Sequence, residues 1–157
     1  MVSWVKGLPE KTILEISSEV ASTILIPSIF SEVIAELEYH RSKKAKVVIL
    51  SSALRPVCQH LADVLGFDDI LSSELEVING RYTGRPKAQL CFGVEKAVRL
   101  RKYCEMNNTT PEKAWYYGDS IPDLFALSIV VNPVCVNPDK KLKKIALKNG
   151  WKINWWH

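Results

Sequence analysis

Two kinds of hydrophobic pattern alternate along the chain. From Leu8 to Tyr39 apolar residues recur at helical spacing with a break at Pro27, which predicts two amphipathic helices. Short apolar runs follow at residues 45–52, 114–117 and 129–136, each about the length of a buried strand. Helical segments separate these runs. Strands that alternate with helices predict an α/β fold built on a doubly wound parallel sheet.

Turn and cap residues divide the rest of the chain. A helical pattern after the first strand ends at Gly66, a residue suited to a helix C-terminus. Asn79 and Gly80 separate two alternating segments, which predicts a tight hairpin. A helix is expected over residues 94–106, another begins near Pro122, and a lysine-rich helix should extend to residue 148.

Composition indicates one ordinary globular domain. The 157 residues are 47% hydrophobic, which is enough for a core, and the net charge is +4. The four cysteines form no Cys-x-x-Cys pair, so we expect reduced and mostly buried thiols in a cytoplasmic protein. No apolar stretch is long enough to span a bilayer, and no secretory signal pattern is present, so we do not expect export. The cysteines are Cys58, Cys91, Cys104 and Cys135.

The segment WYYGDSIPDL places two acids after a predicted strand. Gly118 permits a sharp turn there, and ligands bind at the carboxyl ends of strands in open parallel sheets. Asp119 is either a Mg²⁺ ligand or an ordinary turn residue. Asp123 is either the acid of a capping box with Ser120 or a carboxylate that supports the ligands of a metal.

Three other polar residues lie where an anion could bind. Ser51 and Ser52 end the first predicted strand, where they could donate to a phosphate oxygen or cap the following helix. Lys96 lies in the first turn of a predicted helix, where the helix dipole disfavours a cation. Either an anion compensates Lys96 or its ammonium group is solvated.

The order of these motifs resembles the haloacid dehalogenase (HAD) superfamily, in its phosphoserine-phosphatase-like branch. VVILSS is similar to the second of the four family motifs, GVEK to the third and YYGDSIPDL to the fourth, and the resemblance covers about Leu8 to Trp151. It implies a HAD Rossmann-like core over residues 41–157, preceded at residues 1–40 by the remnant of a helical cap. It also implies a Mg²⁺-dependent phosphomonoester hydrolase that forms an aspartyl-phosphate.

The resemblance implies a role for each candidate residue. Ser51 and Lys96 would be catalytic, because the first donates to the transferring phosphoryl group and the second neutralises its charge. Ser51, Ser52 and Lys96 would bind phosphate. Asp119 and Asp123 would form the metal site, Asp123 by supporting the metal shell or Lys96. The partner is a small phosphorylated substrate of open identity.

The first family motif, Asp-x-Asp-x-Thr or Asp-x-Asp-x-Val, does not occur in this sequence. It carries the nucleophile, so we expect the isolated chain to be inactive and the core to lack its first strand. A start assigned too late, a broken gene and a protein without a nucleophile remain three explanations of this truncated pattern. A missing strand would leave an uncovered sheet edge through which the chain could self-associate. A non-catalytic phosphate-binding or scaffolding protein is the alternative function.

Lysines crowd near the C-terminus, from Lys140 to Lys152, beside three tryptophans. One interpretation is an element for membrane surfaces or nucleic acid. The other is a terminal helix that buries Leu142, Ile145 and Leu147 while its lysines stay solvated. The family resemblance favours the second, so we expect no nucleic-acid partner and no membrane contact.

Overall fold

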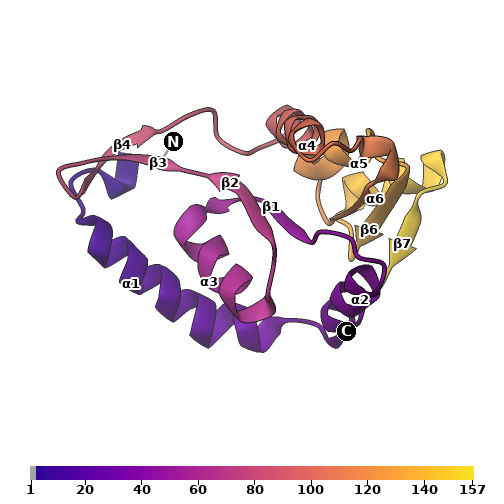
Figure 1. Cartoon of the computed structure of the whole chain (residues 1–157), viewed down its shortest axis with the longest axis horizontal. Helices are drawn as coiled ribbons and strands as arrows, with labels where there is room; N and C mark the ends of the chain where they lie inside the picture. Colours follow the sequence, from indigo (N-terminus) through magenta and orange to yellow (C-terminus); the bar gives the residue numbers. More distant parts are fainter. Residues whose placement is uncertain (1–2) are drawn as a thin grey trace. The chain divides into compact units, whose positions relative to one another are not determined.

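The computed structural model describes residues 3–157 and comprises two compact units, one up to Cys91 and one from Phe92 onward. Figure 1 draws the first in indigo to magenta and the second in orange to yellow. Each unit contains parallel strands with helices beside them. The predicted α/β class with parallel strands is therefore confirmed. The predicted division into a cap remnant and a core stays a prediction.

The first unit begins with the two predicted helices. A 3-10 turn (Ser3–Val5) precedes α1 (Glu10–Val20), which continues through a wide turn (Ala21–Leu25) and a 3-10 turn (Ile26–Ser28). The helix α2 (Ser31–Ser42) follows. Within the described residues no single helix is long and apolar enough to cross a membrane. The helical segments 10–28 and 31–42 are long and apolar enough only when taken together, and their axes are bent by 92° at the break between them.

A β-hairpin forms hydrogen bonds with the residues just before α1. Its strands are β3 (Leu75–Ile78) and β4 (Arg81–Pro86), and Asn79 and Gly80 have φ angles of 50° and 71° between them. The predicted tight turn is therefore confirmed. The backbone N–H of Gly7 donates to the carbonyl of Tyr82 at 2.8 Å, so residues before α1 lie along β4. A small core joins the two segments through Val5, Ile13, Leu75 and Tyr82.

The parallel pair of the first unit consists of β1 (Val48–Leu54) and β2 (Asp69–Ser73). Between them α3 (Arg55–Leu65) packs on both strands and on α1. Gly66 ends α3 with a left-handed φ of 69°, as predicted. The strand β2 was not predicted. Among residues 3–157, no strand other than β2 pairs with β1.

The second unit contains a three-stranded parallel sheet in the order β5 (Trp115–Gly118), β6 (Asn132–Val136), β7 (Lys152–Asn154). The predicted helix α4 (Val94–Met106) precedes a 3-10 turn (Pro111–Lys113). The helix expected near Pro122 is short: a 3-10 turn (Ile121–Asp123) is followed by one α turn, α5 (Leu124–Leu127). The helix α6 (Lys140–Asn149) contacts β6 and β7. The strand β7 was not predicted.

The expectation that α6 buries Leu147 is wrong. Leu142 and Ala146 are fully buried, whereas the Leu147 side chain is 66% exposed. Leu142 and Ala146 lie four positions apart on one face of the helix, and Leu147 lies about 100° further round. The four cysteines are all buried and none of them forms a disulfide, which confirms the expected thiols.

The Asn79-Gly80 turn gives a direct test of the hairpin. We expect Gly80→Ala to lower the free energy of unfolding by about 1 kcal/mol, because a side chain disfavours the left-handed backbone. A Cβ at Gly80 would meet no atom within 4 Å, so sterics add nothing. Urea unfolding followed by circular dichroism measures the change. Asn79→Gly is the control and should lose no stability. Equal stability of Gly80→Ala and the wild type would contradict the turn.

Candidate functional site

The loop after β5 is shaped by a capping box. Ser120 is the N-cap of the turn that contains Asp123, and the Ser120 N–H donates to Asp123 Oδ2 at 3.3 Å. The capping box predicted from the spacing of these two residues is therefore confirmed. Because the loop follows the carboxyl end of a parallel strand, it lies where ligands bind in open α/β sheets.

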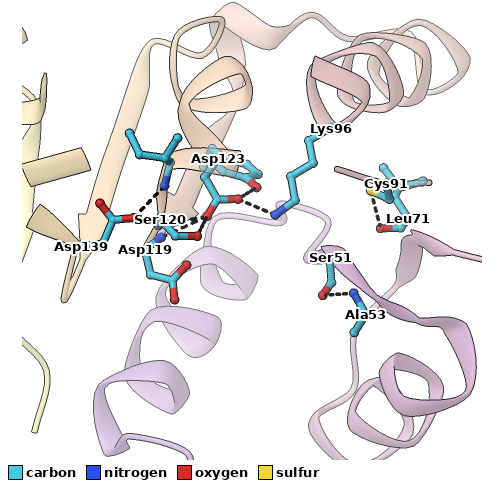
Figure 2. Close-up of polar contacts among 11 residues, drawn as sticks. Ser51, Ala53, Leu71, Cys91, Lys96, Asp119, Ser120, Asp123 and Asp139 are labelled. Carbon is cyan, nitrogen blue, oxygen red and sulfur yellow. Dashed lines mark hydrogen bonds and ion pairs between the residues drawn. The ribbon is translucent and has the colours of Figure 1, made fainter. Parts of the chain in front are cut away.

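The carboxylate of Asp123 is the centre of this loop, and it is only 3% exposed. Its Oδ1 accepts hydrogen bonds from Lys96 Nζ at 2.5 Å and from the Tyr116 hydroxyl at 2.7 Å. Its Oδ2 accepts from the Asp119 N–H at 3.2 Å and from both the N–H and the hydroxyl of Ser120 at 3.3 Å. Figure 2 shows these contacts converging on one side chain. Both oxygens are thus engaged by donors of the protein.

Lys96 is the charged partner of Asp123. It lies in the first turn of α4 and is only 7% exposed. A buried ammonium group needs a partner of opposite charge, since desolvation otherwise favours its neutral form. The ion pair with Asp123 supplies that partner, so the solvated alternative for Lys96 is wrong and the compensating anion is identified.

Burial and charge act in opposite directions on the pKa of Asp123. Burial alone would raise it, because the charged form loses water. The hydrogen bonds from Lys96 and Tyr116 and the positive charge of Lys96 outweigh burial, so the pKa of Asp123 lies below its usual value. Asp123 is therefore ionised at neutral pH.

Gly118 leaves the space that Asp123 occupies. A Cβ added at Gly118 would come within 2.7 Å of Asp123 Cβ and 3.0 Å of its Cγ. Such distances lie well inside ordinary contact, so a larger residue would push the carboxylate away from Lys96. The glycine before Asp119 is therefore required by packing and not by backbone conformation.

Asp119 has a different environment from Asp123. Its main chain is fixed, since its N–H donates to Asp123 and its carbonyl accepts from the Asp139 N–H at 2.8 Å. Its side chain is exposed, and no donor among residues 3–157 engages its carboxylate. In Figure 2 this carboxylate points away from that of Asp123. Asp119 therefore offers an available carboxylate on a rigid backbone.

Sequence reasoning missed Asp139, which ties the loop to α6. Its Oδ2 accepts from the Ile121 N–H at 3.0 Å, and its Oδ1 accepts from the N–H groups of Lys141 and Leu142 at 2.9 and 2.7 Å. The hydrogen bonds from Leu142 and Ile121 hold the pKa of Asp139 below its usual value. An aspartate directly before a helical pattern is an N-cap signal and could have been recognised.

Tyr116 was also missed as a site residue. Its ring is buried and its hydroxyl donates to Asp123, as a buried tyrosine hydroxyl requires. The sequence shows only an aromatic residue within a strand. The acceptor of its hydroxyl is Asp123, seven positions later, and the strand pattern alone does not indicate this contact.

Ser51 and Ser52 belong to the other unit, within β1. Ser51 Oγ accepts a hydrogen bond from the Ala53 N–H at 3.1 Å (Figure 2). The N-cap of α3 is Leu54, with no side-chain cap, so the alternative that these serines cap the helix is wrong. Ser52 is exposed. The structure thus brings together Lys96, Asp119 and Asp123 in one unit and places the two serines in the other.

The residues present fit a Mg²⁺ ion only in part. No group of three or more His, Cys, Asp or Glu side chains that could hold a metal occurs in the described part of the chain. Mg²⁺ commonly uses one or two carboxylates and completes its shell with waters and phosphate. The available carboxylate of Asp119 suits that mode, whereas both oxygens of Asp123 already accept hydrogen bonds.

The Asp123–Lys96 pair predicts a pH-dependent stability. We expect Asp123→Asn to lower the free energy of unfolding by about 3 kcal/mol at pH 7, because it leaves Lys96 buried without an anion. Asp123 has a folded pKa below its unfolded value of about 3.9, so its contribution is complete above that pH and lost as pH falls through the folded pKa. The difference between wild type and Asp123→Asn should therefore shrink below about pH 4.

Urea unfolding across this pH range measures the effect. Asp63→Asn is the matched control, since Asp63 is an exposed acid that accepts a 2.9 Å hydrogen bond from Gln59. It should leave stability almost unchanged. If Asp123→Asn were as stable as the wild type at pH 7, the ion pair would not stabilise this unit.

The chain is similar to known proteins of one family. The family model described as haloacid dehalogenase-like hydrolase matches residues 1–128. The Streptomyces azureus protein named "Inhibition of morphological differentiation protein" is 28% identical over 94% of this chain and 53% of its own length. "Probable phosphatase Rv3661" of Mycobacterium tuberculosis is 30% identical over 88% of this chain and 48% of its own length. The chain thus spans about half the length of these relatives.

Solved structures share the fold. A protein of unknown function from Bordetella pertussis Tohama I has a TM-score of 0.83 and 22% identity, over 92% of this chain and 66% of that one. A structure titled "Phospho-Aspartyl Intermediate Analogue of Phosphoserine phosphatase" has a TM-score of 0.72 and 17% identity, over 97% and 67%. The family resemblance seen in the motifs is confirmed, and the chain belongs to the haloacid dehalogenase-like hydrolase family.

Proposed function

We propose that this chain supplies the phosphate-binding and metal-binding part of a Mg²⁺-dependent phosphomonoester hydrolase. The observation that carries the proposal is the arrangement around Asp123. Its carboxylate holds the buried ammonium of Lys96 and the backbone of Asp119, whose own carboxylate is left available. The relative named as a probable phosphatase supports the same class of reaction.

Lys96 would act by electrostatic stabilisation of the phosphoryl group. Phosphoryl transfer depends mainly on positioning and on neutralising charge on the phosphate oxygens. A lysine is useful for this only if its ammonium group is charged and fixed. Asp123 fixes this group, because its carboxylate pairs with the Lys96 ammonium at 2.5 Å and its own position is fixed by Tyr116 and Ser120.

Asp119 would hold the Mg²⁺ ion. When bound, this ion would supply positive charge to the phosphate and orient it. Asp123 would support the site through the backbone of Asp119 and would not itself bind the metal, since its oxygens are engaged. In the other unit, Ser51 Oγ accepts from the Ala53 N–H, and the Ser51 hydroxyl would donate its proton to a phosphate oxygen.

The nucleophile would have to come from outside these 157 residues. The Asp-x-Asp motif is absent from the sequence, and the chain spans about half the length of its curated relatives. The missing Asp-x-Asp motif also favours a second candidate function, a non-catalytic phosphate-binding or scaffolding protein. The two candidates share the ligand and differ in turnover.

Ligand-dependent stabilisation tests the site. We expect inorganic phosphate to raise the melting temperature, and Mg²⁺ to increase that shift, because ligands that bind the folded state stabilise it by about 2.7 kcal/mol at a hundred times Kd. Asp119→Asn should abolish the Mg²⁺ effect without lowering the melting temperature of the unliganded protein. Asp63→Asn is the control and should keep the full effect.

A turnover assay then separates the two candidates. Because the chain alone lacks the nucleophile, the assay includes an added segment that carries an Asp-x-Asp motif. Hydrolysis of p-nitrophenyl phosphate or phosphoserine by this mixture that needs Mg²⁺ and is lost in Asp119→Asn would establish the hydrolase. Stabilisation by phosphate without turnover of the mixture would favour the non-catalytic candidate. A chain that phosphate and Mg²⁺ do not stabilise would contradict both.

We also propose that the chain self-associates through the outer edge of β1. This strand contains no charged residue and no proline to discourage pairing, and among the described residues it pairs with β2 alone. Light scattering after size exclusion should give a mass that rises with concentration. Successive N–H groups of a strand point to opposite edges, so of the amides of Ile49 and Leu50 the one that faces the outer edge should exchange more slowly at high concentration. The amides of β6, which lies between two strands, should be protected at every concentration. A constant monomer mass would contradict the proposal.

A further inference from the structure

The exposed face of α6 combines positive charge with apolar side chains. The helix buries Leu142 and Ala146 and leaves Leu147 66% exposed. Trp155, just beyond β7, is 52% exposed. The α6 patch is defined here as the six exposed residues Lys140, Lys143, Lys144, Leu147, Lys148 and Trp155.

These residues form one continuous surface. Lys143 and Lys144 lie four and three positions before Leu147, so their side chains neighbour it on the helix. Lys143 Nζ lies 5.1 Å from the centre of the Trp155 ring, a cation–π contact. Lys143 therefore neighbours both Leu147 and Trp155, and two apolar groups lie among the lysines.

The positive charge of the α6 patch is not balanced by nearby acids. The helix contains no Asp or Glu, and the Asp139 carboxylate before it is engaged in capping. Among residues 3–157, no carboxylate pairs with Lys140, Lys143, Lys144 or Lys148 within 4.0 Å. A surface of this kind is complementary to an anionic partner.

We propose that the α6 patch binds the surface of an anionic lipid bilayer. Leucine and tryptophan side chains insert at the headgroup level, and lysines beside them bind lipid phosphates while their alkyl chains cover apolar surface. The α6 patch provides both kinds of group on one helix face. This inference reverses the expectation that the chain makes no membrane contact, which assumed that Leu147 is buried.

Nucleic acid fits the α6 patch less well. Single strands are bound by stacking bases on open aromatic faces. The one exposed aromatic ring of the α6 patch, Trp155, has the Lys143 ammonium over its face. Leu147 provides no surface on which a base can stack, whereas a bilayer interface uses an aliphatic side chain directly. The exposed leucine therefore favours lipid.

Vesicle co-sedimentation tests the proposal without reference to phosphatase activity. The protein is mixed with vesicles of phosphatidylcholine alone or of phosphatidylcholine and phosphatidylglycerol in equal parts. We expect binding only to vesicles that contain phosphatidylglycerol, and weaker binding as salt is raised. Lys144→Gln should lower the partition coefficient about fivefold, and Leu147→Ala about tenfold. Trp155→Ala should also weaken binding.

Two residues of α4 provide matched controls. Lys102→Gln removes an exposed lysine, and Met106→Ala shortens an apolar side chain that is 72% exposed. Both should leave the partition coefficient unchanged, and all variants should keep the wild-type melting temperature. The proposal is overturned if low-salt vesicles with phosphatidylglycerol do not bind the protein, or if the controls weaken binding as much as Leu147→Ala. Binding of a single-stranded oligonucleotide in place of these vesicles, lost in Lys144→Gln, would equally overturn it.

Discussion

The second unit depends on one buried carboxylate. Asp123 neutralises Lys96 from α4, accepts the Tyr116 hydroxyl from β5 and fixes the backbone of Asp119 and Ser120. A helix, a strand and a loop are thus joined at a single side chain. Because both oxygens of Asp123 accept hydrogen bonds, the carboxylate is held ionised and in place, and Gly118 provides the room for it.

The structure gives different environments to two acids that look equivalent in the sequence. Asp119 and Asp123 are four positions apart, and both are carboxylates after the same strand. Burial distinguishes them, because Asp123 faces donors inside the unit and Asp119 faces solvent. The hydrogen bonds of Asp123 already fix the backbone of Asp119, so little conformational entropy would be lost if Asp119 bound a cation. Such pre-organisation is the usual basis of electrostatic catalysis on phosphate.

The sequence predicted most helices and the hairpin correctly, because the residues that specify these elements lie close together along the chain. The hairpin at Asn79-Gly80, the end of α3 at Gly66 and the span of α4 all depend on residues close in sequence. The strands β2 and β7 were missed because each is short and pairs with a distant strand. Tyr116 and Leu147 were misjudged for a related reason, since their neighbours are set by packing. The motifs of the resemblance identified Lys96, Asp119 and Asp123 before their contacts were known.

The hairpin of the first unit also has a consequence for the order of folding. The Arg81 guanidinium donates to the carbonyl of Gly7 at 2.8 Å across 74 positions of sequence, and the neighbouring backbone bonds span similar distances. Contacts of such large separation require a long loop to close before they form, which slows folding. During synthesis, residues 7–10 leave the ribosome long before β4 exists. Their side of the core must stay exposed until then, so residues 7–10 cannot reach their final packing before the hairpin has been made.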